Sequence, residues 1–531
     1  MKLNNWFIIR ADFAEHIGIG HAMRCLAFAE WAVELSIKPI LLSKQHSEFI
    51  NKKIKSLGGE LVILPPTKKK STTTYPHSSW LECTELDDAN VSATEIHKLM
   101  REYNIAPLFI MLDHYAIAAP WERELEKIAP LLVIDDLSDR PHDCTWLIDQ
   151  TFGKTRLDYK KLIPDRTETF IGSDYALLRK EFTNIHSTNI EIDTNSTIKI
   201  LVTLGGIDKA NDTKKIVEYL LSNLFIKKHI KLTLVTSSSN PHISQLEELA
   251  SSTINIELII DSNNIAQLMN RHDLCIGAAG STSWERCAMS LPTITLVTAE
   301  NQREIAKNLA NNKAIINLGD IAQLTKETLI KTVLVLMNNK EALNALAINS
   351  RKICDGKGAA RILACISTFL EKNKLYITRC RLATKKDIKL VFDWQKLPET
   401  RRFSLNTDVP AFEEHQQWML RKLDSINDYF YIIELKNHID KKFYPAGVVR
   451  LDESADNTYI ISIFIGPKYF GQGIAQETLK FIDIVHPEIT INATVLKDNI
   501  ASHKLFTKLN YQKLNTETYQ RPPIKIVEKN E

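Results

Sequence analysis

The stretch DFAEHIGIGHAMRCLAFAEWA (residues 12–32) sets the fold expected for the first two thirds of this chain. It follows an apolar segment that begins at Trp6, and it carries Gly18 and Gly20 ahead of an apolar run with helical spacing. This order predicts a strand, a tight turn and a helix. Glycines let a turn approach a ligand closely, and ligands of open α/β sheets bind at the carboxyl ends of the strands. The stretch therefore predicts a Rossmann-like unit with Gly20 at its binding site.

His21 stands directly after the second glycine, at the start of the predicted helix. An imidazole at a helix N-terminus tends to stay neutral, because the helix dipole disfavours added positive charge. A neutral histidine can act as a general base at physiological pH. The alternative is a histidine that hydrogen-bonds and braces the turn. The glycines alone do not decide between the two, because the third glycine of a dinucleotide-binding motif is missing.

Length and composition favour a multidomain soluble globular protein. At about 150 residues per domain, the 531 residues predict three or four domains. The net charge is +3, which is too small to favour a nucleic-acid partner. No apolar run approaches the roughly 18 residues of a membrane helix, so we expect no membrane partner. The 8 cysteines form no C-x-x-C pair, which is typical of reduced thiols and predicts a cytoplasmic protein.

Short apolar runs alternate with helical patterns over the first 370 or so residues, which predicts parallel sheets of the doubly wound type. The predicted strands are residues 6–10, 39–43, 108–113, 131–136, 199–206, 231–236, 273–280 and 293–298. Helical patterns include Met23–Glu34, Asn264–Met269 and a closing tail over Lys326–Asn373. The pattern restarts near Ile198, after a polar stretch at 186–197. The sequence thus predicts two Rossmann-like halves, residues 1–190 and 191–373.

A third domain, residues 374–531, follows with a different pattern. A strand and a helix fill residues 376–395, and further apolar strands follow at 431–435, 446–451, 459–466 and 490–495. Because less helix separates these strands, the pattern predicts an α+β domain. The fold class expected for the whole chain is therefore α/β, with two Rossmann-like halves followed by an α+β domain.

The segment IRADFAEHIGIGHAMRCLAFA resembles the N-terminal motif of the UDP-sugar hydrolases of pseudaminic acid biosynthesis. The resemblance covers about residues 6–320 and continues through LDHYAI (112–117), IDDLSDRPHDC (134–144), IGSDYALLRKEF (171–182), LVTLGGIDKAN (201–211), TSSSNPHISQL (236–246), DSNNIAQLM (261–269) and AENQRE (299–304). It implies a GT-B-like architecture, with the active site between the two halves. It also implies hydrolysis of a UDP-linked diacetamido-trideoxy-altrose to free sugar and UDP.

The resemblance gives roles to named residues. His21 would activate water, which attacks the anomeric carbon with inversion while UDP leaves. Asn301 would position the sugar or the water. Asp113, His114 and Tyr115 end a predicted strand at the cleft edge, where they would shape the sugar pocket; the alternative is that they brace the fold. The paired aspartates Asp135 and Asp136 follow the next strand, where they either contribute to function or cap a helix.

The second half is expected to bind UDP. Helix N-termini and glycine turns can stabilise the charge of a leaving diphosphate, and Gly205 and Gly206 form such a turn. Gly280 and Ser281 resemble the helix start at which GT-B proteins hold a nucleotide diphosphate. Glu285 would bind the ribose hydroxyls; the alternative is a surface glutamate on a helix. The family needs no metal, and we expect none here.

The stretch ISIFIGPKYFGQGIAQETLKFI (461–482) resembles the acetyl-CoA loop of GNAT acetyltransferases. Successive backbone N–H groups in such a loop can hold a pyrophosphate, although an ordinary strand–helix turn would have the same sequence pattern. Phe470 replaces the usual first Arg or Gln of the motif. The residues that match the motif are Gly471, Gln472, Gly473, Ile474 and Ala475. Acetyl-CoA is therefore the implied co-substrate.

Downstream, ATVLKDNIASHKLFTKLNYQK (493–513) matches the next GNAT motif, in which Asn499 would hold either the pantetheine arm or the helix start. Phe506 takes the place of the tyrosine that serves many family members as general acid, which leaves Tyr511 or water as substitutes. Residues 401–418 resemble the substrate-side segment of GNAT enzymes that acetylate amino-sugar nucleotides. There His415 and Trp418 are either a base and a stacking platform or core residues of a helix.

Together the two resemblances predict a bifunctional enzyme of pseudaminic acid biosynthesis, which feeds flagellin or surface-polysaccharide glycosylation. The acetyltransferase would acetylate the 4-amine of a UDP-amino sugar, and the hydrolase would then act on the product. One alternative is a GT-B glycosyltransferase that passes the sugar to an acceptor. A second is a degenerate GNAT domain that only regulates. A third is acetylation of a protein N-terminus or of a different amino sugar, such as a legionaminic precursor.

Overall fold

The computed structural model describes residues 5–14, 17–67, 75–183, 197–370, 377–437, 439–440 and 442–524. These fall into two compact units, residues up to Ala359 and residues from Ala360 onward. The predicted domain boundaries at 190/191 and 373/374 lie outside the described residues, as does most of the polar stretch at 186–197. Both boundaries therefore stay predictions.

The first half of unit one is built on a parallel sheet. Among the described residues its strand order is β3-β2-β1-β4-β5-β6-β7. The strands are β1 (Asn5–Ala11), β2 (Ile37–Ser43), β3 (Glu60–Ile63), β4 (Ile110–Asp113), β5 (Leu131–Ile134), β6 (Trp146–Asp149) and β7 (Glu168–Ile171). The central strands are buried along nearly their whole length, as helices on both faces require. The predicted Rossmann-like sheet is thus confirmed.

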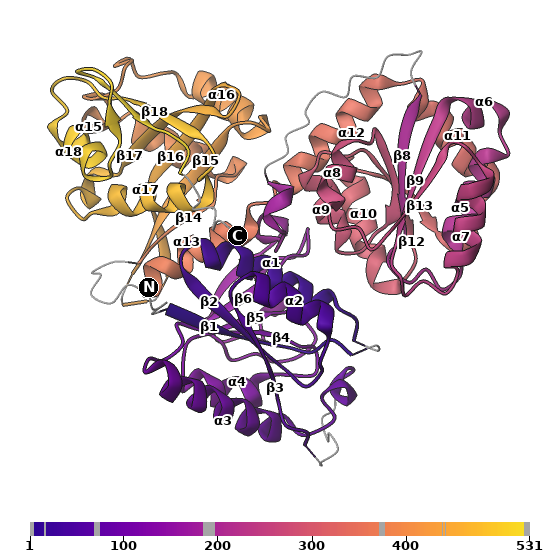
Figure 1. The fold of residues 1–531 in the computed structure, drawn as a ribbon. Coiled ribbons are helices and arrows are strands. Elements are labelled where there is room, and N and C mark those ends of the chain that lie inside the picture. The colour runs from indigo at the N-terminus through magenta and orange to yellow at the C-terminus, as the bar shows by residue number, and fades with distance from the viewer. Residues whose placement is uncertain are drawn as a thin grey trace. The chain divides into compact units, whose positions relative to one another are not determined.

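Helices cover both faces of this sheet. Figure 1 shows α1 (Gly20–Glu34) and α2 (Glu48–Ser56) on one face and α3 (Glu85–Tyr103) and α4 (Ala119–Glu126) on the other. Helix α1 begins three residues before the start at Met23 that periodicity predicted. The earlier start brings Gly20 and His21 into the first turn of α1, at the carboxyl edge of the sheet.

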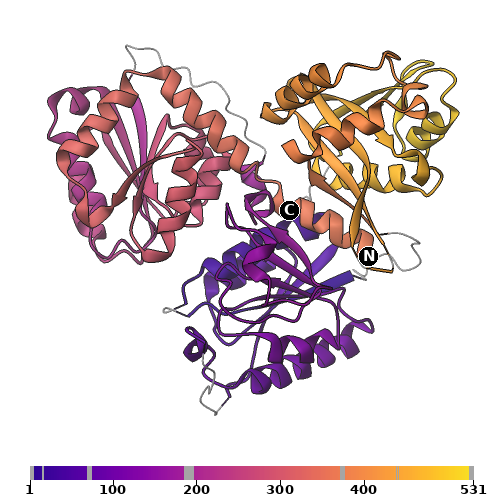
Figure 2. The same cartoon turned by 180° about the vertical axis from the view of Figure 1, so that it is seen from behind.

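The second half of unit one repeats the design. Its parallel strands run in the order β10-β9-β8-β11-β12-β13 among the described residues. They are β8 (Ile198–Thr203), β9 (Ile230–Thr236), β10 (Ile256–Ile260), β11 (Leu274–Ala278), β12 (Thr293–Val297) and β13 (Ile316–Asp320). The flanking helices, seen from behind in Figure 2, are α5 (Asp212–Leu221), α6 (Leu224–His229), α7 (Ile243–Ser252), α8 (Ile265–Asn270), α9 (Thr282–Ala288) and α10 (Arg303–Asn311).

The predicted helical tail is three helices, α11 (Lys326–Met337), α12 (Lys340–Ile353) and α13 (Gly358–Leu370). The chain between α12 and α13 packs against the end of the first half. Ser173 Oγ donates to the Ile353 carbonyl over 2.5 Å, and a Cβ at Gly358 would overlap the Ala176 backbone. Glycine is required at that close approach.

Unit two contains a mixed sheet in the order β14-β15-β16-β17-β18-β20-β19 among the described residues. Its strands are β14 (Thr378–Leu382), β15 (Tyr429–Lys436), β16 (Phe443–Ala455), β17 (Thr458–Ile465), β18 (Thr490–Thr494), β19 (Gln512–Lys513) and β20 (Thr518–Arg521). Its helices from β14 onward are α14 (Ile388–Gln395), α15 (Pro398–Arg401), α16 (Phe412–Asp424), α17 (Ile474–Val485) and α18 (Ile500–Lys508). The α+β class predicted for this region is confirmed.

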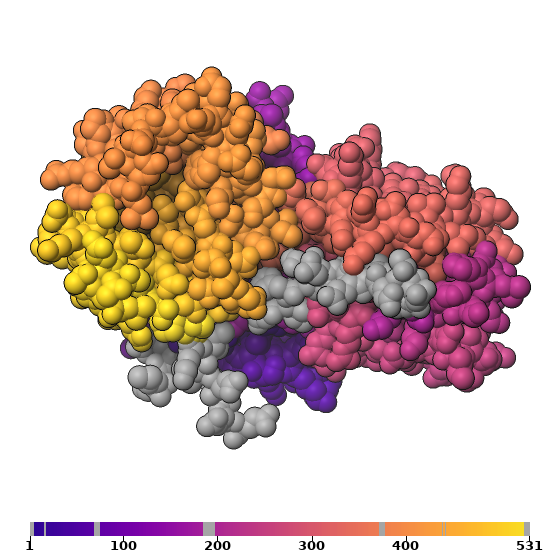
Figure 3. Space-filling view, turned by 90° about the horizontal axis from the view of Figure 1, so that it is seen from above, coloured from indigo at the N-terminus to yellow at the C-terminus, as the bar shows by residue number. Residues whose placement is uncertain are grey.

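Alternate side chains of β15 point to opposite layers of unit two. Phe430 contacts Trp418 of α16, while Tyr431 contacts Phe481 of α17. Both faces of the sheet are therefore covered, one by α14 and α16 and the other by α17. Figure 3 draws this unit in orange to yellow as a space-filling surface. In the part of the chain that the structure describes, no helix is long and apolar enough to span a bilayer.

Candidate active sites

His21 is held by a carboxylate at the end of a neighbouring strand. Its Nδ1 lies 2.5 Å from Oδ1 of Asp113, the last residue of β4. Because strands β1 and β4 pair in parallel, the turn after β1 and the end of β4 meet at one sheet edge. A nitrogen that faces a carboxylate carries the proton, so Nε2 of a neutral His21 has the free lone pair. Among the described residues no group hydrogen-bonds to Nε2.

Arg24, one helical turn after His21, fixes the same carboxylate. Its Nε lies 2.5 Å from Asp113 Oδ2 and its Nη2 lies 2.7 Å from Oδ1. The third nitrogen, Nη1, donates to Asp136 Oδ2 over 2.7 Å, and the Tyr115 hydroxyl donates to Asp136 Oδ1. The Tyr115 ring then packs edge-on against the His21 ring at 4.4 Å. These five residues form a closed circle of contacts, here called the His21 network.

The His21 network sets the charge state of Asp113. Burial alone would raise the pKa of this carboxyl, but the Arg24 guanidinium and His21 hold it well below its usual range. Burial raises the pKa of the Tyr115 hydroxyl, and the Asp136 carboxylate raises it further. Asp113 is therefore an anion and Tyr115 a neutral donor at physiological pH. An anionic Asp113 keeps the proton on Nδ1 of His21 and leaves Nε2 free to accept another.

His114 lies in a different environment from the two residues beside it. It is buried, its Nδ1 accepts from the Ala116 N–H, and its Nε2 lies 3.2 Å from Asp12 Oδ2. Asp12 in turn pairs with the buried Arg10, which also pairs with Asp88. Burial lowers the pKa of His114. This geometry favours the alternative that His114 braces the fold beneath the site.

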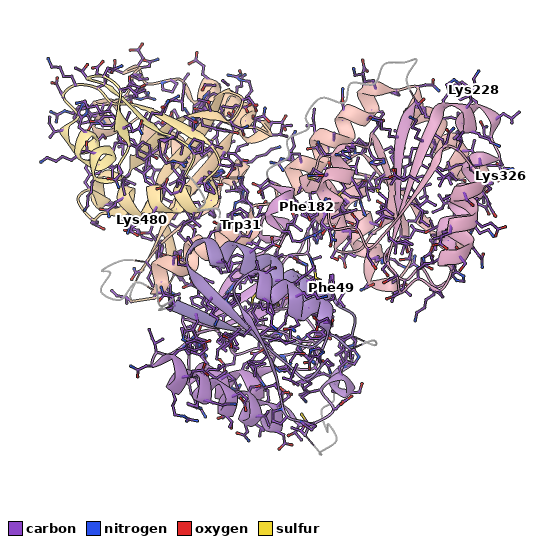
Figure 4. The ribbon with its side chains drawn as sticks, in the orientation of Figure 1. Trp31, Phe49, Phe182, Lys228, Lys326 and Lys480 are labelled. Atoms are coloured by element: carbon purple, nitrogen blue, oxygen red, sulfur yellow. The ribbon has the colours of Figure 1, made fainter. Side chains whose placement is uncertain are left out.

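A cavity of about 610 Å³ is lined by residues from both halves of unit one. His21 and Arg24 line it from α1, and Phe49, labelled in Figure 4, lines it from α2. The structure brings these predicted site residues together there: Gly20, His21, Tyr115, Gly205, Gly206, Gly280, Ser281, Glu285 and Asn301. Asp113 and His114 do not line it, because Asp113 lies behind His21 and His114 lies deeper. The volume falls within the range of small-molecule sites, about 300–1,000 Å³.

The second half contributes two glycine-containing loops and one acid, Glu285, to the cavity. Gly205, with φ +104°, stands in the loop after β8, and Gly280 and Ser281 directly precede α9. Burial raises the pKa of the Glu285 carboxyl, while Arg179 and Arg286 oppose that rise. Arg179 Nη2 lies 3.8 Å from Glu285 Oε1. Asn301 lies exposed in the short helix Glu300–Gln302, so its amide is accessible from the cavity.

In unit two, β17 and β18 pair over three residues only, Thr458–Ile460 with Thr490–Asn492. Beyond these residues β17 pairs with β16 alone and β18 with β20 alone in the described chain. The two parallel strands therefore diverge toward their carboxyl ends. The predicted acetyl-CoA loop follows β17 at this divergence, as ligand binding at the carboxyl edge of parallel strands requires.

The loop backbone is glycine-dependent. Gly471 and Gly473 have φ of +74° and +77°, and a Cβ at either would meet open space. Gly473 caps α17, whose first residues are Ile474 and Ala475. Gln472 beside them donates weakly to the Lys468 carbonyl over 3.4 Å. Asn499 caps α18 by accepting from the Ser502 N–H over 3.1 Å, which matches the helix-start alternative for this residue.

Two family models match the chain. Residues 200–362 match the glycosyltransferase family 28 C-terminal domain, and residues 379–512 match the acetyltransferase (GNAT) domain. The chain therefore joins a region similar to the first domain type to a region similar to the second. The first match covers most of the second parallel sheet, and the second covers the mixed sheet as far as the start of β19, so the predicted GT-B-like and GNAT architecture is confirmed.

The chain is similar to one relative over nearly its whole length and to others over part of it. An uncharacterized protein of Methanocaldococcus jannaschii is 22% identical over 95% of this chain and 96% of its own length. The UDP-2,4-diacetamido-2,4,6-trideoxy-β-L-altropyranose hydrolase of Campylobacter jejuni is 29% identical over 57% of this chain and 95% of its own. The spore coat polysaccharide biosynthesis protein SpsG of Bacillus subtilis is 26% identical over 40% of this chain and 61% of its own.

Several GNAT-domain candidates lie in the core. Phe506 is buried and stacks with Tyr519 at 5.7 Å. Tyr511 is buried too, and burial together with Asp483 raises its pKa well above the usual range of a tyrosine, which makes it a weak general acid. His415 is buried with Nε2 on the Ile388 carbonyl, and burial lowers its pKa. The core-packing alternative is therefore favoured for His415, and Tyr511 is a poor substitute acid.

Sequence reasoning missed Arg24 and Arg179. Arg24 had a detectable signal, because residues three apart on a helix share a face and Arg24 follows His21 by three. Arg179 had none, since its place in the cavity depends on the loop after β7. In the described chain no group of three His, Cys, Asp or Glu side chains is arranged to hold a metal ion.

Proposed function

We propose that the chain is a bifunctional enzyme of pseudaminic, or nonulosonic, acid biosynthesis in the cytoplasm. Unit one hydrolyses UDP-2,4-diacetamido-2,4,6-trideoxy-β-L-altropyranose to the free sugar and UDP, the reaction named for its Campylobacter relative. The GNAT domain acetylates the 4-amine of the UDP-amino sugar precursor. The product supplies flagellin or surface-polysaccharide glycosylation.

The observation that carries the hydrolase proposal is the His21–Asp113 pair on the wall of the cavity. Nδ1 of His21 donates to Asp113, so Nε2 accepts the proton of a water molecule. The water oxygen attacks the anomeric carbon from the face opposite UDP. The bond from that carbon to the phosphate oxygen breaks, and UDP departs with the electron pair.

The second half binds the leaving group in this proposal. The exposed backbone around Gly205, Gly206, Gly280 and Ser281 supplies N–H donors for the diphosphate. Glu285 accepts hydrogen bonds from the ribose hydroxyls, and Asn301 orients the sugar or the water. Departure of UDP needs no metal here, because the developing charge meets these donors directly.

The GNAT loop of residues 471–475 would hold acetyl-CoA by its pyrophosphate, with the thioester between the diverging β17 and β18. Acetyl-CoA supplies the activated acetyl group. The sugar amine, in its neutral form, attacks the thioester carbonyl; the C–S bond breaks as the amide forms, CoA leaves as its thiolate, and the nitrogen gives up a proton to water. With Phe506 in the core, no side chain is assigned as the acid for the departing sulfur.

Phosphorus NMR tests both steps in one tube. The wild-type chain receives the UDP-4-amino sugar with and without acetyl-CoA. UDP release only with acetyl-CoA supports both activities and their order. If no UDP appears, the pre-acetylated sugar nucleotide is added. Release of UDP at that point supports the hydrolase activity but not the proposed acetyltransferase activity. If UDP is still not released, the proposed hydrolase activity is excluded as well.

A GT-B glycosyltransferase is the second candidate, and the match of residues 200–362 to a glycosyltransferase family favours it. Such an enzyme would transfer the sugar to an acceptor instead of to water. The two reactions are distinguished by the sugar product. Stoichiometric free sugar from purified protein without added acceptor excludes the glycosyltransferase.

A further inference from the structure

Unit two contains a small polar cavity that none of the predicted site residues lines. Its volume is about 80 Å³, too small for a whole nucleotide sugar, since ligand pockets span about 300–1,000 Å³. It therefore fits a single small group of a larger ligand. The residues around it are Gln395, Thr400, Arg401, Ser404, Phe430, Val448, Arg450, Ser462 and Phe464.

The lining is suited to an anion. It holds two guanidinium groups, three hydroxyls and one amide, and none of the described residues that line it is a carboxylate. Arginine binds phosphate through paired N–H donors, and such charge-assisted bonds are among the strongest in proteins. A neutral or cationic group would leave the Arg401 guanidinium without a counter-charge at the cavity wall, whereas Arg450 already pairs with Asp452.

Arg401 is placed by its backbone contacts but not neutralised. Its Nε donates to the Gln395 carbonyl over 2.6 Å and its Nη1 to the Asn406 carbonyl over 3.2 Å. Among the described residues no carboxylate forms an ion pair with it, and its Nη2 has no hydrogen-bond partner. Burial accordingly lowers the pKa of Arg401, against a weak opposing effect of Asp408.

Arg450 faces the same cavity from the sheet. Its Nε donates to Asp452 over 2.7 Å and its guanidinium lies 4.9 Å above the Trp418 ring, which orients the group. In the described chain its two Nη atoms make no hydrogen bond. The Trp418 ring therefore stacks with the Arg450 guanidinium rather than with a sugar or uracil ring.

The cavity adjoins the proposed acetyl-transfer site. In the sheet register Arg450 pairs with Ser462 and Val448 pairs with Phe464. Ser462 and Phe464 belong to the part of β17 that has left β18. A ligand group in the cavity thus lies next to β17, the strand that borders the proposed acetyl-CoA site. It lies on the side of the sheet that carries α14 and α15.

We propose that Arg401 and Arg450 bind a phosphate of the acceptor and thereby select a nucleotide-linked amine over a protein N-terminus. The inference rests on the proposed acetyltransferase function. The proposed phosphate site is separate from the loop of residues 471–475, which is proposed to bind the pyrophosphate of acetyl-CoA. The alternative source of the same chemistry, a phosphate of CoA, is separated from the acceptor by the test.

The test measures acetyl transfer by full-length protein to three acceptors: the UDP-4-amino sugar, the same amino sugar without its nucleotide, and a short peptide with a free N-terminus. Arg401→Ala and Arg450→Ala are compared with Arg402→Ala, a matched control because Arg402 is exposed and lies outside the cavity. Because Arg401 also braces its loop, Ser462→Ala, on an exposed strand position, provides a variant that leaves the fold intact. Acetyl-CoA affinity is measured by calorimetry.

We expect each arginine variant to raise the KM for the UDP-amino sugar about 10-fold or more, since one charge-assisted hydrogen bond contributes about 1.5–3 kcal/mol. The rate with the nucleotide-free sugar and the affinity for acetyl-CoA should stay unchanged, and Arg402→Ala should match wild type. A smaller KM rise in Ser462→Ala is expected. Inorganic pyrophosphate should compete with the UDP-amino sugar in wild type and lose potency in both arginine variants.

Unchanged acceptor KM in both arginine variants, with active wild type, overturns the phosphate site and leaves the proposed function standing. Weakened acetyl-CoA binding instead of a raised acceptor KM assigns the cavity to CoA and overturns the proposal as well. Wild-type activity on the peptide alone contradicts the proposed function itself.

Discussion

Nδ1 of His21 lies 2.5 Å from Oδ1 of Asp113, and Arg24 contacts both oxygens of that same carboxylate. One buried carboxylate thus orients the base and receives a bidentate guanidinium. Since each partner uses a different lone pair of Asp113, neither displaces the other. This arrangement makes the orientation of His21 depend on Asp113, which does not itself line the cavity.

Asp113→Asn tests that dependence. The amide keeps the shape but can no longer favour the proton on Nδ1, so Nε2 loses its role as acceptor. We expect kcat for UDP release to fall about 100- to 10,000-fold with KM little changed. Steady-state kinetics with the pre-acetylated UDP-sugar measures it, and a kcat within a few-fold of wild type would contradict the assigned role.

Arg24→Met removes the cation that offsets the burial of Asp113. Breaking a buried ion pair costs about 3–5 kcal/mol, so the free energy of unfolding should drop by that order at neutral pH. The exposed pair of Arg123 and Asp143 offers the control, because Arg123→Met should have little effect.

The pH dependence of the Arg24→Met effect has a definite sign. In wild type the pKa of Asp113 is held low, so its contribution to stability is present above its unfolded pKa and is lost only as the pH falls through the folded value. In the variant burial raises this pKa, and Asp113 takes up a proton at a higher pH. The difference in melting temperature between variant and wild type should therefore shrink as the pH is lowered from neutrality. A constant difference would refute this account.

The raised pKa of His142 predicts that the protein loses stability as the pH rises above neutrality. Burial alone would lower its pKa, but Glu122, 2.6 Å from Nδ1, and Asp135 raise it to about 9. This contribution is full below the unfolded pKa of about 6.5 and is lost as the pH rises through the folded value. The thermal midpoint of wild type should fall over that window. His142→Gln should start lower and show a flatter profile; equal slopes for the two proteins would exclude the effect.

Two substitutions of Gly473 distinguish the effect of backbone strain on stability from the effect of an added side chain on acetyl-CoA binding. Gly473→Ala should cost about 1 kcal/mol of stability because alanine disfavours positive φ. Asparagine tolerates that region better, so Gly473→Asn should recover part of the stability. Both side chains fill the space where the acetyl-CoA pyrophosphate is proposed, so calorimetry should find weaker binding in both. Normal affinity in the asparagine variant would argue against the loop as the site.

The sequence was sufficient where short-range patterns decide the outcome. The apolar run at Trp6, the glycines and the helical spacing predicted β1, the turn and α1, and the strand ending at Asp113 was predicted to reach the same edge. An α+β third domain was predicted from its strands, and the resemblance of its glycine loop to the acetyl-CoA loop implied a GNAT domain. The strands, the turn and the helix depend on hydrophobic periodicity and on the backbone freedom of glycine, which neighbouring residues set.

The sequence was insufficient where contacts join distant segments. Arg24 meets Asp113 and Asp136 across 89 and 112 residues, and no local pattern encodes that match. Tyr115 was predicted at the cavity, but its neighbour His114 points to Asp12, because adjacent residues beyond a strand face different layers. The cavity of Arg401 and Arg450 likewise exists only once a loop and a strand are brought together.

The divergence of β17 from β18 has a thermodynamic consequence. Residues 461–465 of β17 have strand pairing on one side only among the described residues, although they lie inside a sheet. An extended ligand chain seated there acts as a substitute strand, so ligand occupancy and unfolding are linked by mass action. The midpoint of thermal unfolding of this domain would then rise with the concentration of acetyl-CoA.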